Sequence, residues 1–117
     1  MAYMPFMFEN LDVYKKSIEF AVEIDILCRK IRHAEMKDQI QRASLSIPLN
    51  IAEGNGRNTR KEKIQFFKTA RGSLFECIPL LQLARKLDYI SEDQYGPLYA
   101  LSENIGKMIN GLINSMA

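Results

Sequence analysis

Two stripes of polar side chains have spacings that would place each stripe on one face of a helix. The first has steps of four, four, three and four residues and consists of Arg42, Ser46, Asn50, Glu53 and Arg57. The second has steps of four, four and three residues and consists of Gln65, Thr69, Ser73 and Glu76. Residues three or four positions apart are neighbours on a helix surface. Glu53 and Glu76 are therefore candidates for a carboxylate pair that transfers protons or holds a metal.

Other features of the sequence argue against catalysis. Arg57 and Arg71 are available to neutralise the two carboxylates. His33 is the only histidine, so a histidine-based metal site or catalytic triad cannot form. There is no glycine-rich phosphate loop, nucleophile elbow or Cys-x-x-Cys motif. We predict that the protein is not an enzyme and uses no catalytic residue, cofactor, metal or small-molecule substrate; an enzyme centred on the two glutamates is the alternative.

A structural seam is the favoured interpretation of the two stripes, with ligand binding as the alternative. The stripes lie on either side of a short turn that contains Gly54 and Gly56, so their helices should pack side by side in opposite directions. Buried polar groups are costly unless each finds a hydrogen-bonding partner. The expected network brings Glu53 and Arg57 to Gln65 and Thr69, and Ser46 and Asn50 to Ser73 and Glu76.

Basic residues are concentrated in the middle of a chain whose net charge is only +2. Residues 57–71 contain one acidic residue, Glu62, and six basic ones: Arg57, Arg60, Lys61, Lys63, Lys68 and Arg71. Several of them cluster where a helix begins, and the N-terminus of a helix favours anions. These six residues are candidates for contacts with the phosphates of RNA or DNA; a solvated surface is the alternative.

The hydrophobic periodicity predicts four helices and no strand, at about residues 11–31, 35–54, 59–88 and 91–115. Thr59 with Glu62, and Ser91 with Gln94, have the spacing of capping boxes at the starts of the last two helices. Gly54 and Gly56 are expected to end the second helix with a positive φ. Short connections favour an antiparallel up-down four-helix bundle that forms a single domain over residues 1–117.

The chain has more apolar surface than one such bundle can bury. Residues 11–31 carry two apolar stripes and residues 35–54 two apolar edges, and the N-terminal tail adds Tyr3, Phe6, Met7 and Phe8. An apolar surplus of this kind usually marks a subunit interface, so we predict a homo-oligomer. No segment is long enough to span a bilayer, and Cys28 and Cys77 fit small buried side chains in a reducing cytoplasm.

The stretch from Gln39 to Gly54, together with Arg57 and the stretch from Ala70 to Glu76, resembles the 23S rRNA intervening-sequence proteins, also labelled S23 ribosomal proteins. The most specific part is Ser-Ile-Pro-Leu-Asn-Ile-Ala-Glu-Gly at residues 46–54. The segment from Phe8 to Tyr14 also resembles the start of the family, so the resemblance covers nearly the whole chain.

The resemblance implies a compact four-helix subunit that assembles into a ring, typically a homopentamer. Relatives serve as accessory proteins of diversity-generating retroelements, where a basic ring binds nucleic acid and a reverse transcriptase. We therefore predict a cytoplasmic, non-enzymatic, homo-oligomeric module that binds RNA, DNA or a nucleic-acid enzyme through its basic residues. The alternative is a protein–protein interaction scaffold without affinity for nucleic acid.

Overall fold

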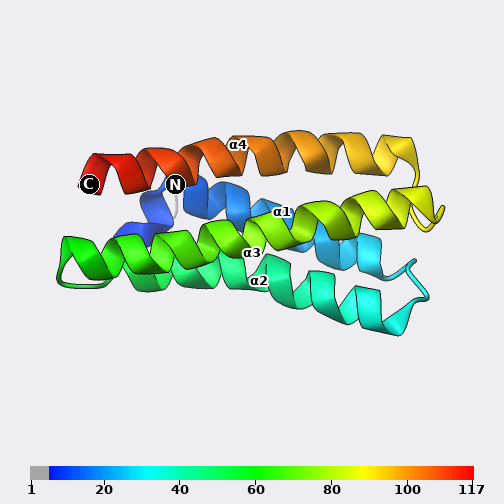
Figure 1. Ribbon diagram of the computed structural model, residues 1–117, viewed down its shortest axis with the longest axis horizontal. Coiled ribbons are helices and arrows are strands. Elements are labelled where there is room, and N and C mark those ends of the chain that lie inside the picture. Colours follow the sequence, from blue (N-terminus) through cyan, green and yellow to red (C-terminus); the bar gives the residue numbers. More distant parts are fainter. Residues whose placement is uncertain (1–5) are drawn as a thin grey trace.

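The computed structural model describes residues 6–117, which contain four α-helices and no strand (Figure 1). The helices are α1 (Asp12–Cys28), α2 (Ala34–Asn55), α3 (Arg60–Lys86) and α4 (Glu92–Met116), and a short 3-10 helix, η1 (Met7–Asn10), precedes them. Each helix begins and ends within three residues of the range expected from the sequence. Tyr3 of the apolar tail lies outside the described residues.

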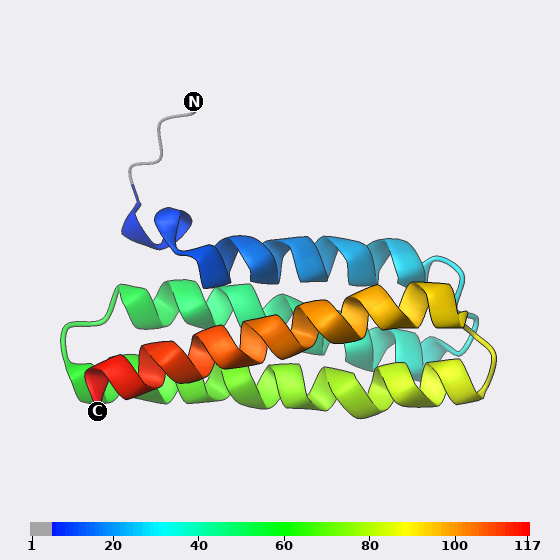
Figure 2. The same cartoon turned by 90° about the horizontal axis from the view of Figure 1, so that it is seen from above.

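The four helices close into a bundle in which each helix packs against two others. The contacts join α1 to α2, α2 to α3, α3 to α4 and α4 to α1, so α1 and α3 lie on a diagonal. The chain turns back at each of the three connections, as Figures 1 and 2 show from two sides. This order creates four long grooves, one between each pair of neighbouring helices.

The core consists of aliphatic and aromatic side chains that each helix contributes from one face. Those that are fully buried include Phe20 and Ile24 of α1, Ile40, Ile47 and Ile51 of α2, Phe67, Leu74 and Leu81 of α3, and Ile105 and Ile109 of α4. Their spacing of four or seven residues within a helix places them on one stripe. The helices therefore owe their stability to packing along these stripes rather than to local propensity.

Side chains cap the starts of three helices. Ser91 and Gln94 form the expected capping box of α4, with the Ser91 amide donating to Gln94 at 2.8 Å. The Thr59 hydroxyl accepts a hydrogen bond from the Glu62 backbone amide at 3.1 Å, but the Glu62 carboxylate accepts from that hydroxyl at 3.0 Å and not from the Thr59 backbone amide. The start of α2 was not anticipated: His33 Nδ1 accepts the Met36 amide at 3.1 Å. Histidine is not among the usual capping residues, so no sequence pattern predicted this cap.

The expected positive φ at Gly54 and Gly56 is wrong. Gly54 lies inside α2, and Gly56 ends the helix with a φ of −84°. Among residues 6–117 the positive φ belongs instead to Asp88, at 61°. Asp88 follows the last turn of α3, where the Tyr89 amide donates to the Ala84 carbonyl at 2.8 Å and the Asp88 amide to Arg85 at 3.0 Å. These two bonds form a Schellman motif, which ends a helix sharply whether or not glycine supplies it.

Candidate functional site

The polar seam between α2 and α3 is short. The Ser73 hydroxyl donates to Ser46 Oγ at 2.8 Å and so joins the two helices. The side-chain amide of Asn50 donates to the backbone carbonyl of Ser46 at 2.8 Å and to the Ser46 hydroxyl at 2.9 Å. All three residues are half-buried. They form one connected set of hydrogen bonds that fixes the level at which α2 meets α3.

The other six residues of the two stripes do not join this set. Arg57, which follows the end of α2, pairs with Glu53 at 2.9 Å, and Arg42 pairs with Asp38 at 2.9 Å within α2. The Thr69 hydroxyl donates to the Gln65 carbonyl of its own helix at 3.1 Å. Those six residues, Arg42, Glu53, Arg57, Gln65, Thr69 and Glu76, are exposed. The closed network therefore does not form, because long charged side chains reach water and pair within one helix at less cost than burial.

Glu53 and Glu76 are also too far apart to act together. Since Ser46 lies opposite Ser73, the two glutamates are separated by about ten residues along the helix axes, on the order of 15 Å. Glu76 lines a shallow groove over the seam, together with Arg42 and Gln39, whereas Glu53 does not. No group of three or more histidine, cysteine or acidic side chains within the described part of the chain could hold a metal ion.

The six candidate residues for nucleic-acid binding divide into two sets of three. Arg57 stacks on the Phe66 ring at 4.6 Å in addition to its pair with Glu53. The Lys63 ammonium donates to the Asn55 carbonyl at 2.6 Å, and Arg71 donates to Asn110 of α4 at 2.9 Å. The other set is Arg60, Lys61 and Lys68, which are exposed and have no hydrogen bond or ion pair of their side chains to residues 6–117. These three can contact an external anion without losing an existing partner.

A wide apolar surface lies between α1 and α2, beside η1. A groove of about 610 Å³ runs there, and Phe8, Tyr14, Ile18, Ala21, Val22, Ile26, Leu45, Pro48, Leu49 and Ala52 contribute its apolar lining. Leu49 is 65% exposed, and Val22 and Leu45 are each more than half exposed. The apolar surplus of the sequence indicated such a surface, but only the packing shows which side chains remain outside the core.

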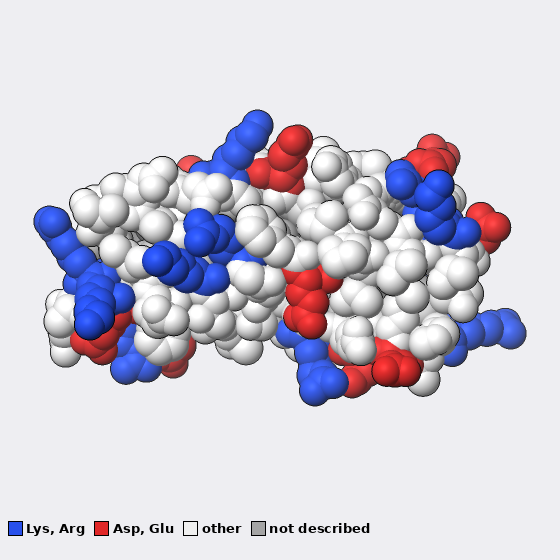
Figure 3. Space-filling model, viewed as in Figure 1, with Lys and Arg blue, Asp and Glu red and all other residues white. Residues whose placement is uncertain are grey.

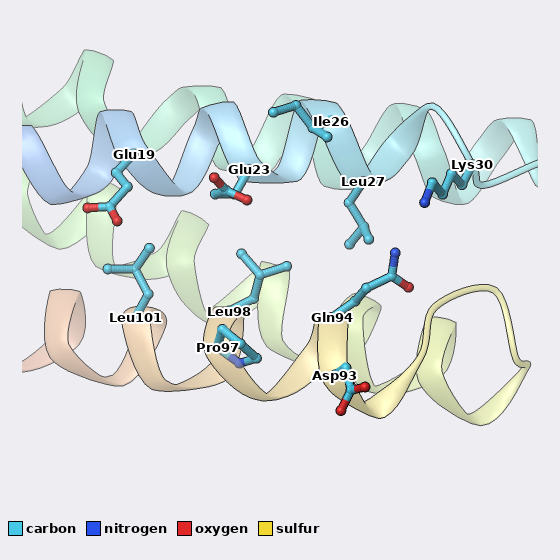
Figure 4. A pocket seen from close by; sticks show the side chains of 10 residues that line it. All are labelled: Glu19, Glu23, Ile26, Leu27, Lys30, Asp93, Gln94, Pro97, Leu98 and Leu101. Atoms are coloured by element: carbon cyan, nitrogen blue, oxygen red, sulfur yellow. The ribbon is translucent and has the colours of Figure 1, made fainter.

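The groove between α1 and α4 carries acidic side chains without forming a site (Figure 4). Glu19 and Glu23 of α1 lie across from Leu98 and Leu101 of α4, and Asp93 points away from them. The carboxylates do not converge on one point. None of the helices in the described part of the chain combines the length and hydropathy needed to cross a membrane.

These features define a small all-helical protein whose prominent surfaces are an apolar groove and a helix start with unpaired basic side chains. The sequence profile of the 23S rRNA-intervening sequence protein family matches residues 9–111, and the chain belongs to this family. The chain is also similar to a solved structure from Bacteroides thetaiotaomicron VPI-5482, a protein of unknown function from the S23 ribosomal protein family. The two are 30% identical with a TM-score of 0.80, over 86% of this chain and 97% of that one. No curated protein matches the chain.

Proposed function

We propose that this protein is a non-catalytic module that assembles with copies of itself and binds nucleic acid. In this proposal an antiparallel up-down bundle is the subunit of a homo-oligomeric ring, with five copies as the expected size, in the cytoplasm. The observation that carries the self-assembly is the apolar groove between α1 and α2. The observation that favours nucleic-acid binding is the set of unpaired basic residues at the start of α3.

A second copy of this chain is the occupant that best fits the groove between α1 and α2. Five aliphatic side chains are 40–65% exposed along it, which are Ile18, Val22, Ile26, Leu45 and Leu49. Isolated exposed apolar residues are ordinary, but a continuous strip of this kind usually marks an interface. The charged residues beside it, Asp25 and Arg29, pair with each other at 3.5 Å. The rim is therefore balanced in charge and favours a neutral apolar partner over a strongly charged one.

A ring places a further requirement on this contact. When the same surface patch meets itself, the product is a closed dimer with two-fold symmetry. A ring of more than two copies instead needs the groove to receive a different face of the next copy. In the expected ring, each subunit therefore binds one neighbour in its α1/α2 groove and inserts a different face into the groove of the other neighbour.

Replacing Leu45 by glutamate should break the assembly, because a buried carboxylate without a partner opposes the contact. Leu83→Glu on α3 is the matched control, since Leu83 is 50% exposed and Leu45 55%. Light scattering after size-exclusion chromatography should give about five times the 13.5 kDa chain mass for the unchanged protein and for the control. The Leu45 variant should elute as a folded monomer. An unchanged protein that is already monomeric would contradict self-assembly.

Nucleic-acid binding is proposed through Arg60, Lys61 and Lys68. Arg60 and Lys61 lie on the first turn of α3, where the helix dipole adds to their positive charge, and Lys68 lies about two turns further along the helix. The phosphates that these residues contact would belong to RNA or DNA, either free or in complex with a nucleic-acid enzyme. A ring would repeat the three cations around its axis and raise the local potential above that of one chain.

Charge removal at these three positions should flatten the salt dependence of binding. Each lost phosphate contact lowers the slope of log affinity against log salt by about 0.7–0.9 per site, so the triple change to glutamine should lower it by roughly 2–3. A second triple variant, Lys15→Gln, Lys30→Gln and Arg32→Gln, removes the same charge from α1 and the turn after it. Binding measured by gel retardation at increasing salt should be weakened far less in this control. Absence of binding at low salt would support the alternative, a scaffold for protein partners alone.

A further inference from the structure

The groove between α3 and α4 is lined by two exposed aromatic rings together with the basic side chain of Lys107. It has a volume of about 260 Å³ and a floor that includes Leu74 and Ile78. Two rings line it and remain open to solvent: Phe75 is 59% exposed and Tyr99 is 42% exposed. A phenylalanine exposed to this extent contributes little to the core, and its ring is open to contact from outside the bundle.

The packing beneath Tyr99 holds its ring in place. Its edge meets the ring of Tyr95 with centroids 5.6 Å apart. Arg85 in turn lies over the Tyr95 ring at 3.9 Å. A ring that is already held loses little conformational entropy when a flat ligand stacks on it.

Basic side chains surround the Phe75 end of the groove. Arg71 donates to Asn110 across the groove at 2.9 Å and has no carboxylate partner among the described residues. Lys68 and Lys107 are exposed and likewise have no ion pair within residues 6–117. The groove lining itself has one carboxylate, Glu103, and one cation, Lys107, and Arg71 and Lys68 add positive charge beside it on α3. Figure 3 shows basic side chains gathered over the neighbouring parts of α3 and α4.

The alignment of α3 with α4 places the rings and the cations in sequence along the groove. Arg71 lies opposite Asn110, and Gly106 lies beside Leu74. Continuing this alignment, Tyr99 lies six or seven residues beyond Phe75, on the order of 10 Å along the axis. The rings are therefore two separate platforms. Arg71 and Lys68 follow Phe75 on the same face of α3, toward Lys61 at the start of the helix.

We propose that this face binds single-stranded RNA or DNA, with bases stacked on Phe75 and Tyr99 and phosphates held by Lys68, Arg71 and Lys107. Sequence-tolerant binding of single strands commonly combines aromatic platforms with a positively charged track. A duplex keeps its base faces stacked inside and cannot use the rings. The inference rests on the proposed nucleic-acid binding and adds the strand type and the residues that select it.

The first test compares single strands with a duplex. Fluorescence anisotropy would follow binding of oligouridine, oligothymidine and a duplex of the same length. Phe75→Leu and Tyr99→Leu keep an apolar side chain but remove the stacking face, so each should weaken single-strand binding by roughly 5- to 100-fold. Duplex binding should change little. Phe6→Leu is the matched control, because Phe6 is 62% exposed but lies before η1 and outside this groove.

A tryptophan reporter tests stacking directly. The chain contains no tryptophan, so Phe75→Trp or Tyr99→Trp introduces one emitting indole. Oligothymidine and oligouridine should quench either reporter, whereas a Phe6→Trp reporter should stay unquenched. The two oligomers also show whether RNA or DNA is preferred.

Three outcomes separate this inference from the function on which it rests. If neither single strands nor duplexes bind at low salt, the proposed nucleic-acid binding fails and this inference with it. If both bind equally and the leucine variants are unaffected, nucleic-acid binding stands and the stacking groove is overturned. If Phe75→Leu or Tyr99→Leu reduces the oligomer mass, a second copy covers this face, which also overturns the inference.

Discussion

Gly54→Ala is expected to destabilise the protein by about 1–3 kcal/mol, although alanine is the better helix former. A Cβ at this position would lie 2.7 Å from a ring atom of Phe67 and 3.0 Å from Cβ of Phe66. Phe67 is fully buried in the core, so its ring cannot move aside cheaply. Thermal unfolding followed by circular dichroism should show a melting temperature lower by several degrees.

Gly72→Ala provides the matched control for that change. Gly72 is also inside a helix, but a Cβ there would meet nothing within 4 Å. Without a clash, the lower entropy of the unfolded chain should leave the protein equally stable or more stable by up to about 1 kcal/mol. Equal melting temperatures for the two variants would show that the close approach of α2 to α3 at Gly54 is unimportant.

The two thiols should react far more slowly in the folded protein than in the unfolded chain. Burial raises the pKa of Cys28 from 9.0 to about 11 and that of Cys77 from 9.0 to about 12. At pH 8 the thiolate fraction should fall by about a hundredfold for Cys28 and a thousandfold for Cys77, because each pKa unit is a factor of ten. The thiolate is the reactive form, so labelling by a disulfide reagent slows at least as much.

Cys28→Ala and Cys77→Ala, each of which leaves one thiol, would assign the two rates. Both variants should label rapidly in denaturant, and rapid labelling of either one while folded would contradict burial as the cause. The same shifts set a direction for stability. Because the thiol pKa is higher in the folded protein than in the unfolded chain, the thiols do not lower the free energy of unfolding below pH 9. As the pH rises from 9 toward 11–12, the unfolded chain loses its thiol protons first, so the buried thiols should favour unfolding only in alkaline solution.

Local patterns were sufficient to locate the helices and their best-capped starts. Phe67, Leu74 and Leu81 recur at heptad spacing in the sequence, and the structure buries all three. Ser91 and Gln94 form their capping box because both partners lie within one turn. Such signals depend on residues three or four positions apart. The sequence alone was therefore enough to predict these helices and caps.

The candidate site was predicted less well, because its charged side chains could form ion pairs or hydrogen bonds with more than one partner. Arg57 had the spacing of a seam residue, yet it pairs with Glu53 one turn away and stacks on Phe66. Lys63 and Arg71 belonged to the basic segment, but their side chains bind Asn55 and Asn110. A partner on another helix, such as Asn110, cannot be read from the spacing of the basic segment alone.

By itself, the sequence determined the family, the four helices and the apolar surplus, since these follow from motif and periodicity. Only the tertiary structure decided that the hydrogen-bonded seam consists of Ser46, Asn50 and Ser73. It also decided that Gly54 does not end a helix but leaves room for the Phe67 ring to pack closely against it. It further decided which three of the six basic candidates have no side-chain partner among residues 6–117, and that Phe75 and Tyr99 line one groove. The reason is physical: these outcomes depend on the rotation and level of one helix against the next, which the packing of the whole core sets.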